Sequence, residues 1–443
     1  MNNAYDYDCV VIGGGLAGLT CGLKCLAEGL SCAVISSGMS ALHFSSGSID
    51  LLGHHPGREV VFSPMDTLPD FINTNPGHPY AKCGLHDIVE AMDFLHQEIN
   101  AQGTRLFSNG RYNHFHITAV GTLKPTFFSP ASVFTQEIKT VFEKKPCIAI
   151  LNIKGFRDFH PVLAAANLNR HRLFSHCRIT CGEIELPGQK TAAYGTADMR
   201  SVDVARILDS ASDLRDVAEA VSTASGKADI VALPALLGLN RYPEIVDELR
   251  RATDRLIYEI PTLPPSILGM RLDNALKARF AAQGGIFIAS ETIESGTVEN
   301  DRVVSIHTLN QGDDIRAACY VLASGSFFSK GLSSRYGRMT EPVFDCRLDI
   351  PPDCKSLAAE SFFSPKSHDF LRAGVKTDER LNPETTSGQA VTNLYCAGAV
   401  LSSYNPVNEG SGGGVAVATG YKAAKQIVAR IVNEKHPENR GPE

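Results

Sequence analysis

The sequence predicts an α/β protein with a parallel sheet, and three observations support this prediction. An apolar run at residues 9–12 leads directly into Gly13-x-Gly15-x-x-Gly18 and a helical pattern. Strand and helix patterns alternate through the middle of the 443-residue chain. Near the end, two strands that finish in glycine precede a glycine-rich helix start. Together they predict a Rossmann-like domain of the FAD/NAD(P)-binding type with an inserted α/β domain.

The first element is a buried strand at residues 9–12, followed by a helix at 19–27 that ends at Gly29. Glycines at this turn allow backbone N–H groups to approach a phosphate, which the positive end of the helix dipole also attracts. The alternative is a glycine turn that binds nothing. We expect the cofactor-binding residues here to be Gly13, Gly14, Gly15, Leu16, Ala17 and Gly18.

A second strand is predicted at residues 31–35, and Ser36 follows it. Dinucleotide-binding units carry an Asp or Glu at this position to accept hydrogen bonds from the ribose. A serine hydroxyl can accept a bond too, but it carries no charge. Either Ser36 simply replaces the usual acid in a protein that binds FAD, or the adenosine half of the ligand is absent and the cofactor is FMN. The residues alone leave both interpretations open.

The loop after this strand combines a histidine with three serines around a glycine. Such a loop can bind phosphate oxygens or a flavin ribityl chain. His43 is a candidate acid or base, because an imidazole titrates near neutral pH; a structural role is the alternative. The expected cofactor-binding residues of the loop are Ser45, Ser46, Gly47 and Ser48.

The middle of the chain predicts a second α/β unit, with strands at 147–153, 229–233 and 286–289 and helices at 159–168, 241–252 and 271–283. We place the inserted domain at residues 61–299 and the nucleotide-binding domain at 1–60 and 300–443. Arg271 follows Pro264-Pro265 and is predicted in the first turn of a helix, where the dipole disfavours it. A bound anion would offset this, which makes Arg271 a candidate phosphate clamp; a surface salt bridge is the alternative. His114 and His116 are predicted to be polar surface.

The last part of the chain predicts strands at 317–323 and 394–399 that end near Gly325 and Gly398. A helix then runs to about residue 432. If its N-terminus faces a flavin, its dipole would stabilise the reduced ring; simple helix packing is the alternative. The expected cofactor-binding residues are Gly325, Gly398, Gly412, Gly413, Gly414 and Val415.

Composition excludes several functions. The net charge is −6 and no dense basic stretch occurs, which argues against nucleic acid as a partner. No apolar run approaches the ~20 residues of a membrane span, and the early first strand predicts no signal peptide. The twelve cysteines form no CxxC motif, so we expect no metal centre in this chain.

Five segments together resemble the B-subunit family of the anaerobic glycerol-3-phosphate dehydrogenase, and more broadly the fumarate reductase flavoprotein class. They are residues 11–19, 40–48, 263–269, 322–328 and 412–415. The most specific are Ala-Leu-His-Phe-Ser-Ser-Gly-Ser and Leu-Ala-Ser-Gly-Ser-Phe-Phe. The resemblance implies a subunit that binds FMN, with FAD as the alternative. The chain departs from the broader class at Ala399, where an acidic residue would follow Gly398.

The family resemblance also implies the reaction. The protein would oxidise sn-glycerol 3-phosphate to dihydroxyacetone phosphate by hydride transfer from C2 to flavin N5, while a base removes the hydroxyl proton. Electrons would pass to the quinone pool through a complex with a catalytic dehydrogenase subunit and a membrane-associated iron–sulfur subunit. We therefore expect a cytoplasmic protein held loosely at the inner face of the cell membrane. The alternatives are a flavin protein that only relays electrons, and a free-standing FAD oxidoreductase of another hydroxy acid.

Overall fold

The computed structural model describes residues 6–55, 59–133, 145–187, 199–336, 338–351, 357–362, 364 and 367–435. The chain forms two compact units. The first contains Met1–Ala41, Ile49–Gly103 and Asp273–Glu443, and the second contains Leu42–Ser48 and Thr104–Leu272.

Five parallel strands form the central sheet of the first unit, in the order β11-β2-β1-β15-β20. Their bounds are β1 Tyr7–Ile12, β2 Cys32–Ser36, β11 Ile286–Ala289, β15 Ala317–Leu322 and β20 Leu394–Cys396. Cys9, Val10 and Val11 of the central strand are fully buried, which confirms the apolar run as a core strand. Because all five strands are parallel, their carboxyl ends lie along one edge of the sheet, the edge at which such sheets bind ligands.

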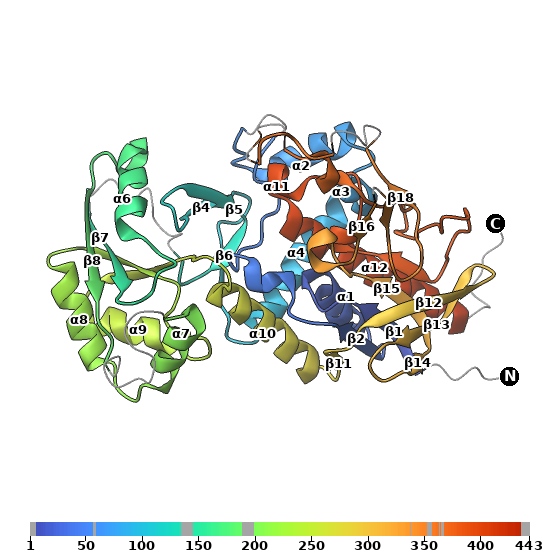
Figure 1. Ribbon diagram of the computed structural model, residues 1–443, viewed down its shortest axis with the longest axis horizontal. Coiled ribbons are helices and arrows are strands. Elements are labelled where there is room, and N and C mark those ends of the chain that lie inside the picture. The colour runs from blue at the N-terminus through green and yellow to red at the C-terminus, as the bar shows by residue number, and fades with distance from the viewer. Residues whose placement is uncertain are drawn as a thin grey trace. The chain divides into compact units, whose positions relative to one another are not determined.

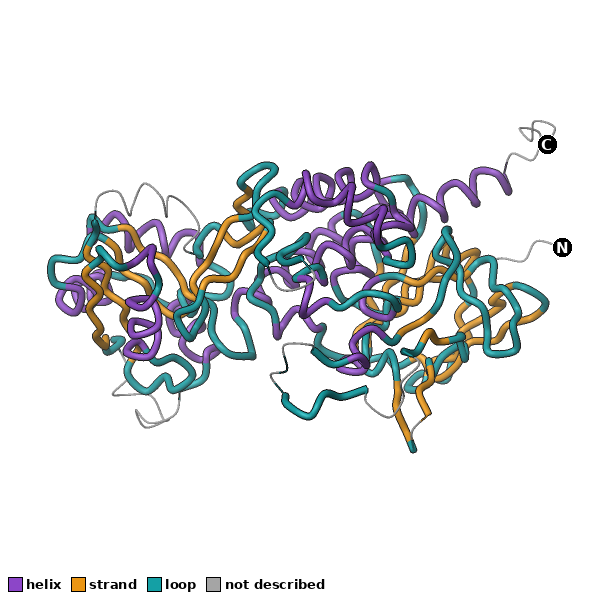
Figure 2. The backbone as a smooth tube through the Cα atoms, turned by 90° about the horizontal axis from the view of Figure 1, so that it is seen from above, coloured by secondary structure: helices purple, strands orange, loops and turns teal. Residues whose placement is uncertain are grey.

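Helices from both ends of the chain pack together in the first unit. α1 (Leu16–Ala27) packs against α12 (Gly412–Lys435), and α12 packs against α4 (Leu85–Asn100). Figure 1 shows α1 in blue beside the red α12, and the helices in Figure 2 gather on one side of the strands of this unit. The two helices approach closely because Gly420 has no Cβ, which would overlap the carbonyl of Ala17.

Smaller elements complete the first unit. A three-stranded antiparallel sheet has the order β12-β13-β14, a short hairpin pairs β16 with β17, and β18 pairs antiparallel with β19. Their bounds are β12 Ile293–Glu299, β13 Arg302–Thr308, β14 Asp314–Ile315, β16 Ser333–Arg335, β17 Arg338–Thr340, β18 Leu348–Asp349 and β19 Gly374–Val375, and the short helices are α2 Pro64–Thr74, α3 Pro79–Cys83 and α11 Pro406–Glu409.

The second unit has its own parallel sheet, in the order β10-β9-β7-β8, and its own apolar core. The elements are β7 Cys147–Ile153, β8 Arg178–Ile184, β9 Ile230–Pro234, β10 Leu256–Ile260, α6 Pro161–Arg170, α7 Ser201–Ser210, α8 Arg215–Ser225 and α9 Tyr242–Thr253. Two antiparallel pairs join β3 (Leu106–Ser108) with β6 (Phe128–Pro130) and β4 (His114–Ile117) with β5 (Leu123–Thr126). The inserted α/β unit predicted from the sequence is therefore present.

The bounds of the two units differ from the predicted 1–60, 61–299 and 300–443. Residues 61–103 belong to the first unit because α4 packs on α12, and residues 273–299 belong to it because β11 pairs with β2. The loop 42–48 groups with the second unit. Helix α10 (Ile267–Ala282) begins in the second unit and ends in the first. Among the described helices, none has the length and apolar character needed to span a membrane.

Candidate functional site

The turn between β1 and α1 is shaped by glycines with different tasks. Gly13 has φ +118°, and a Cβ there would overlap the carbonyl of Ala323 at the end of β15. A Cβ at Gly18 would overlap the carbonyl of Gly13. Gly15 differs, because a Cβ on it would meet no atom within 4 Å. Gly13 and Gly18 are therefore required by the protein itself, whereas the space beside Gly15 is open.

The N-terminus of α1 leaves donors available beside this open space. Gly15 is the N-cap residue and no side chain caps the helix. The first intrahelical bond runs from Leu19 N–H to the Gly15 carbonyl (2.9 Å), so the N–H groups of Leu16, Ala17 and Gly18 have no acceptor within the helix. These donors, the open face of Gly15 and the positive helix end fit the phosphate of a nucleotide cofactor.

At the end of β2, Ser36 lies beside the glycine turn. A Cβ on Gly14 would lie 3.0 Å from the Ser36 Cβ and 2.8 Å from Cζ of Phe287 on β11. The Ser36 hydroxyl donates to the Gly38 carbonyl at 3.1 Å. The neighbouring Glu291, whose N–H donates to the Ser36 carbonyl, is buried. Its carboxylate accepts the backbone N–H groups of Thr292, Asn310 and Gln311. This carboxylate is therefore not a replacement for the acid that is missing at Ser36.

Gly325 and Gly398 follow the carboxyl ends of β15 and β20, and Gly398 lies against α1. Both have positive φ, at +87° and +76°, and a Cβ on Gly398 would lie 2.7 Å from the Ala17 Cβ. The buried Oγ of Ser324 has no hydrogen-bond partner among the described residues. A buried hydroxyl is normally paired, so an unpaired one at the carboxyl edge of the sheet fits a polar group of a bound ligand.

A small cavity of about 120 Å³ lies next to these strand ends, and the sequence did not predict it. Ser326 and Ala399, which follow the two glycines, line it together with aromatic residues. The aromatic lining is Phe327, Phe328, Phe370 and Tyr404. Aromatic walls of this kind suit the edge of a flat, largely apolar group, and the volume is smaller than that of a complete small-molecule site.

The glycines at the start of α12 have a packing role. A Cβ on Gly414 would overlap the Tyr80 hydroxyl, and a Cβ on Gly413 would lie 3.0 Å from the Asp50 nitrogen. Gly414 N–H donates to the Asp50 carbonyl at 2.8 Å, and Val415 N–H donates to Ser411. Gly412 is looser, with only Pro406 nearby at 3.1 Å. Helix packing, the alternative interpretation of this motif, therefore explains Gly413 and Gly414 without a ligand.

His78 and Glu409 form a buried pair just before α12, and no sequence motif predicted it. Tyr80 N–H donates to His78 Nδ1 at 3.0 Å, so Nε2 carries the proton and donates to Glu409 Oε2 at 3.1 Å. Burial acts to raise the pKa of Glu409, but bonds from His78, the Asn405 N–H and Ser411 outweigh it and hold the pKa below its ordinary value. Both His78 nitrogens are engaged, so the pair positions the α11–α12 turn.

The loop 42–48 lies in the second unit and is tightly fixed there. The His43 carbonyl accepts from Ser266 N–H at 2.8 Å, and Gly47 (φ +70°) packs against Leu268. Ser45 Oγ donates to the Leu42 carbonyl at 2.8 Å and accepts from Gly47 N–H at 3.2 Å. His43, Ser45, Ser46 and Ser48 are all half-buried.

His116, which was predicted to be surface, is instead 1% exposed and contacts this loop. Its Nδ1 lies 3.3 Å from Ser48 Oγ. His114 is buried as well, with Nε2 2.7 Å from Ser129 Oγ. The prediction was wrong because β4 and β5 form a hairpin that buries these side chains in the unit. Burial, followed by the charge of Lys124 and by His114, lowers the pKa of His116 well below its ordinary value, so the ring is neutral at pH 7.

Arg271 is not placed as a phosphate clamp. Helix α10 begins at Ile267, so Arg271 lies beyond the first turn, and its side chain is 3% exposed. Nη1 and Nη2 bind Glu259 Oε2 and Oε1 at 2.5 and 3.0 Å, and Nε donates to the Gly238 carbonyl at 2.9 Å. The anion that offsets its charge is therefore Glu259 of β10, in a buried ion pair. The sequence had suggested either a bound anion or a salt bridge on the surface.

The chain is similar in sequence to known proteins over most of its length. The model of a family described as "FAD binding domain" matches residues 8–415. The B subunit of the anaerobic glycerol-3-phosphate dehydrogenase of Vibrio vulnificus is 37% identical over 426 residues, 96% of each chain. The protein of the same name from Yersinia enterocolitica is 35% identical over 427 residues, 96% of this chain and 99% of the other. A flavocytochrome c3 fumarate reductase structure aligns at TM-score 0.44 and 8% identity, covering 97% of this chain and 79% of the other.

Proposed function

The chain belongs to the B-subunit family of the anaerobic glycerol-3-phosphate dehydrogenase, and on this premise we propose that it oxidises sn-glycerol 3-phosphate to dihydroxyacetone phosphate. It is a flavin-containing subunit of such an oxidoreductase. The strongest support is that the similarity covers nearly the full length of both chains. The open face at Gly15 adds a place in this chain where a cofactor phosphate can bind.

The residues of the first unit have distinct tasks in this function. The N–H groups of Leu16, Ala17 and Gly18 hold a cofactor phosphate against the end of α1. The Ser324 hydroxyl bonds a polar edge of the flavin, and Gly325 and Gly398 allow its close approach. A flavin held by these residues would supply the hydride acceptor for C2 of the substrate.

We assign the proton acceptor to the loop 42–48, with His43 as the candidate base. Ser45 and Gly47 fix the shape of the loop, and His116 holds Ser48 through a contact of 3.3 Å. A neutral, buried imidazole at His116 can hold the Ser48 hydroxyl in one orientation. His116 is therefore a positioning residue for this loop.

The cofactor is a flavin, and two observations bear on whether it is FMN or FAD. The uncharged Ser36 favours FMN, because no carboxylate is present for an adenosine ribose, and the "FAD binding domain" match favours FAD. Mass spectrometry of the flavin released from protein purified from its native host distinguishes them. We expect FMN at one molecule per chain, and FAD would show that Ser36 serves the ribose without a charge.

The names of the relatives imply a complex with other subunits. Within it we propose two partners, a catalytic dehydrogenase subunit and a membrane-associated iron–sulfur subunit, with electrons passing to the quinone pool and the chain held on the cytoplasmic face of the membrane. An electron relay without substrate chemistry is a second candidate function, because Arg271 is engaged by Glu259 and is not available to a substrate phosphate.

An anaerobic titration separates these two functions. The purified, flavin-loaded chain is mixed with glycerol 3-phosphate, and the visible absorbance of the oxidised flavin is followed. Bleaching by substrate alone supports a competent substrate site in this chain. A flavin that stays oxidised until the partner subunits are added supports the relay and withdraws His43 as a base.

A further inference from the structure

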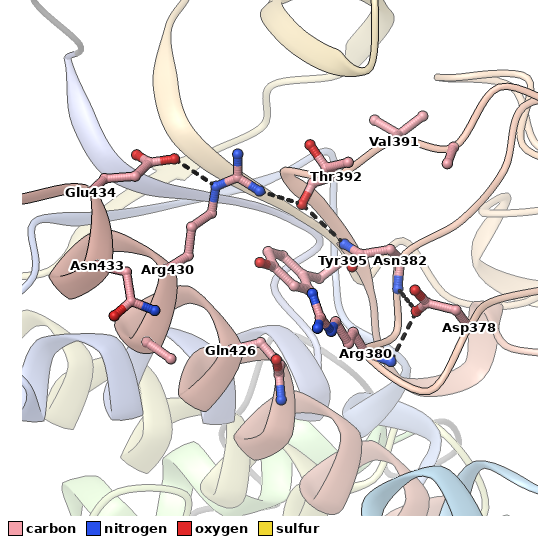
Figure 3. Close-up of a pocket in the computed structure, with 12 residues that line it drawn as sticks. Asp378, Arg380, Asn382, Val391, Thr392, Tyr395, Gln426, Arg430, Asn433 and Glu434 are labelled. Carbon is pink, nitrogen blue, oxygen red and sulfur yellow. Dashed lines mark hydrogen bonds and ion pairs between the residues drawn. The ribbon is translucent and has the colours of Figure 1, made fainter. Parts of the chain in front are cut away.

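A cavity of about 590 Å³ lies in the first unit, away from the glycine turn (Figure 3). Thr392 and Tyr395 line it at the amino end of β20, whereas Gly398 follows the carboxyl end of that strand. Gln426 of α12 also lines it, about 21 Å along the helix from Gly412 at 1.5 Å per residue. The cavity is therefore separate from the candidate cofactor site.

One wall presents Arg380 on a rigid turn. The Asp378 carboxylate accepts the N–H groups of Arg380 and Asn382 through Oδ1, at 2.9 and 2.8 Å, and Asp378 N–H donates to the Asn382 carbonyl at 3.0 Å. Asp378 thus shapes the turn. The Arg380 side chain extends toward Tyr395 (Figure 3), is exposed, and forms no ion pair with any described residue.

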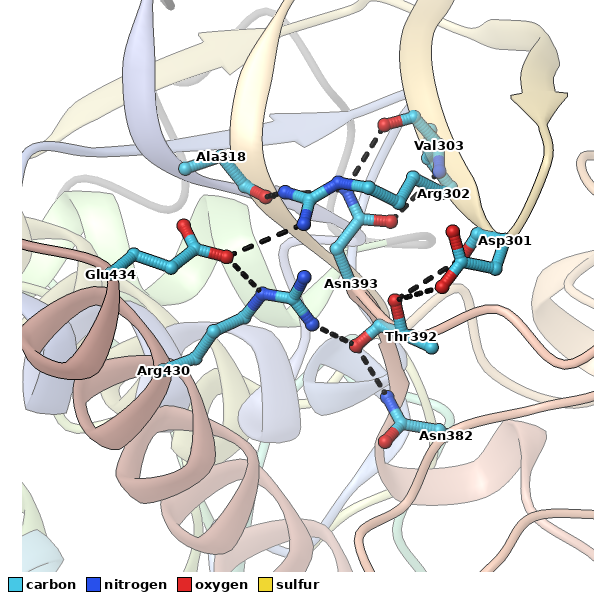
Figure 4. Close-up of polar contacts among 9 residues, drawn as sticks. All are labelled: Asp301, Arg302, Val303, Ala318, Asn382, Thr392, Asn393, Arg430 and Glu434. Atoms are coloured by element: carbon cyan, nitrogen blue, oxygen red, sulfur yellow. Dashed lines mark hydrogen bonds and ion pairs between the residues drawn. The ribbon is translucent and has the colours of Figure 1, made fainter. Parts of the chain in front are cut away.

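The opposite wall presents Arg430, held in a polar network (Figure 4). Nη1 donates to the Thr392 carbonyl at 2.7 Å, and Nε donates to Glu434 at 3.0 Å. Arg302 also binds Glu434, at 3.3 Å, so one carboxylate is shared by two guanidinium groups. Asp301, the other carboxylate of the network, accepts from the Thr392 hydroxyl at 3.2 Å. If Arg430 turned toward a ligand, Glu434 would keep Arg302 as its partner.

The floor of the cavity offers neutral donors. Burial raises the pKa of Tyr395 to about 12, so its hydroxyl stays protonated at pH 7. Gln426 and Asn433 lie seven residues apart on α12, two turns along one face, and add side-chain amides to the lining.

Asp378 and Glu434 also line the cavity, but Asp378 accepts backbone N–H groups and Glu434 is shared by Arg430 and Arg302. Two arginines and the uncharged donors can therefore surround a small ligand.

We propose that this cavity binds a small organic anion, with a carboxylate or phosphate group between Arg380 and Arg430. Guanidinium groups pair with the oxygens of both anions in a planar, two-point geometry. The volume lies within the range of small-molecule sites. The site goes beyond the proposed oxidation, since none of its residues belongs to the glycine turn or to the loop 42–48.

Isothermal titration calorimetry on the flavin-loaded chain at low salt tests this, with citrate and inorganic phosphate as separate probes. We expect saturable binding of one probe, and the probe that binds more tightly identifies the anion class. Arg380→Gln should weaken that binding about tenfold or more, because a charged hydrogen bond is lost. The control is Arg335→Gln, which removes another exposed arginine of the same unit outside the cavity and should change Kd by less than about twofold.

Arg380 is exposed, so Arg380→Gln is expected to fold, and circular dichroism confirms this. Absence of saturable binding by both probes overturns the site. Equal weakening by Arg380→Gln and Arg335→Gln also overturns it, because it indicates general charge screening. Flavin reduction by glycerol 3-phosphate is measured separately on Arg380→Gln, so failure of the anion site is distinguishable from failure of the oxidation.

Discussion

At the scale of single residues, Arg271 and Glu259 form a buried ion pair in the second unit. Both side chains are buried, at 3% and 0% exposure, and are joined by two hydrogen bonds. Glu259 also accepts the Leu237 N–H at 2.9 Å, and the Arg271 guanidinium lies over the Tyr242 ring at 4.2 Å. Removal of one partner leaves the other charge buried and uncompensated.

We therefore expect Arg271→Ala to lower the free energy of unfolding by about 3–5 kcal/mol. The matched control is Arg215→Ala, since Arg215 pairs with Asp213 in the same unit but on the surface, and it should cause no measurable change. Urea denaturation followed by circular dichroism gives both values. If Arg271→Ala were as stable as the wild type but raised KM for glycerol 3-phosphate, the arginine would belong to the substrate site after all.

Substitutions of Gly15 and Gly13 give a paired test of the proposed phosphate site at the N-terminus of α1. A Cβ on Gly15 meets nothing within 4 Å, so Gly15→Ala should fold normally and obstruct only the approach of a phosphate. We expect its flavin Kd to rise about tenfold or more, as for loss of a charged contact. Gly13→Ala should not fold well, because its φ of +118° and the Ala323 carbonyl exclude a side chain.

Flavin binding is measured by fluorescence quenching on the unloaded chain, and stability by thermal denaturation. Gly77→Ala is a suitable control, since its Cβ would lie 3.8 Å from Ser403 in ordinary contact. Unchanged flavin affinity in a folded Gly15→Ala variant would remove the N-terminus of α1 from the cofactor site.

The buried His116 predicts a pH dependence of stability. Its folded pKa is lowered, so the unfolded chain binds a proton more readily, and protonation favours unfolding. The contribution of His116 to stability is complete above the ordinary pKa of about 6.5 and is lost as the pH falls below it.

His116→Gln should therefore lose less stability than the wild type between pH 7 and pH 5, by up to about 1.4 kcal/mol per pH unit. Urea denaturation across this range measures it, and His176→Gln, which removes an exposed histidine of the same unit, should leave the slope unchanged. Parallel slopes for wild type and His116→Gln would contradict a buried, neutral ring.

At the scale of elements, the start of α12 depends on its fit against Tyr80. The Tyr80 hydroxyl donates to the Leu51 carbonyl at 2.6 Å and occupies the space in front of Gly414. We expect Gly414→Ala to lower stability by about 1–3 kcal/mol through overpacking. Tyr80→Phe should cost about 1 kcal/mol for the lost hydrogen bond.

The double variant separates the two effects. Because Tyr80→Phe removes the atom that the new Cβ would overlap, the double variant should be less destabilised than the sum of the single ones. Urea denaturation of all four proteins gives the coupling. Strict additivity would show that Gly414 is required for a reason other than Tyr80.

The elements themselves were largely predictable from the sequence, because their patterns are local. The strand at 9–12, its glycine turn and the strands at 147–153 and 229–233 all occur where apolar runs indicated them. The bounds of the two units were not predictable, since they depend on distant contacts such as α4 on α12.

The same limit applied to the candidate site. The Gly13–Gly18 turn was found from spacing, but the partner of Arg271 lies on another element, β10. The burial of His116 depends on a hairpin whose strands are only four residues long, too short to show a clear period. His78 and Glu409 lie far apart in the sequence and meet only in the fold.

At the scale of the whole molecule, two units with separate sheets should unfold in two steps. The glycine turn lies in the first unit, and the Arg271–Glu259 pair lies in the second. Ligand binding stabilises the folded form that binds it, by about 2.7 kcal/mol at a hundredfold excess over Kd. Differential scanning calorimetry should therefore show two transitions. Added flavin should raise the midpoint temperature of one of them, and Arg271→Ala should lower the midpoint temperature of the other.

The response of the second transition to flavin carries further information. If Ser45, Ser46 and Ser48 bind the cofactor, flavin should raise the midpoint temperature of their unit as well. The double variant Ser46→Ala/Ser48→Ala should then abolish only that increase. If flavin moves the first transition alone, these serines are fixing the loop and not the cofactor. A single transition that shifts with both flavin and Arg271→Ala would contradict two separately folding units.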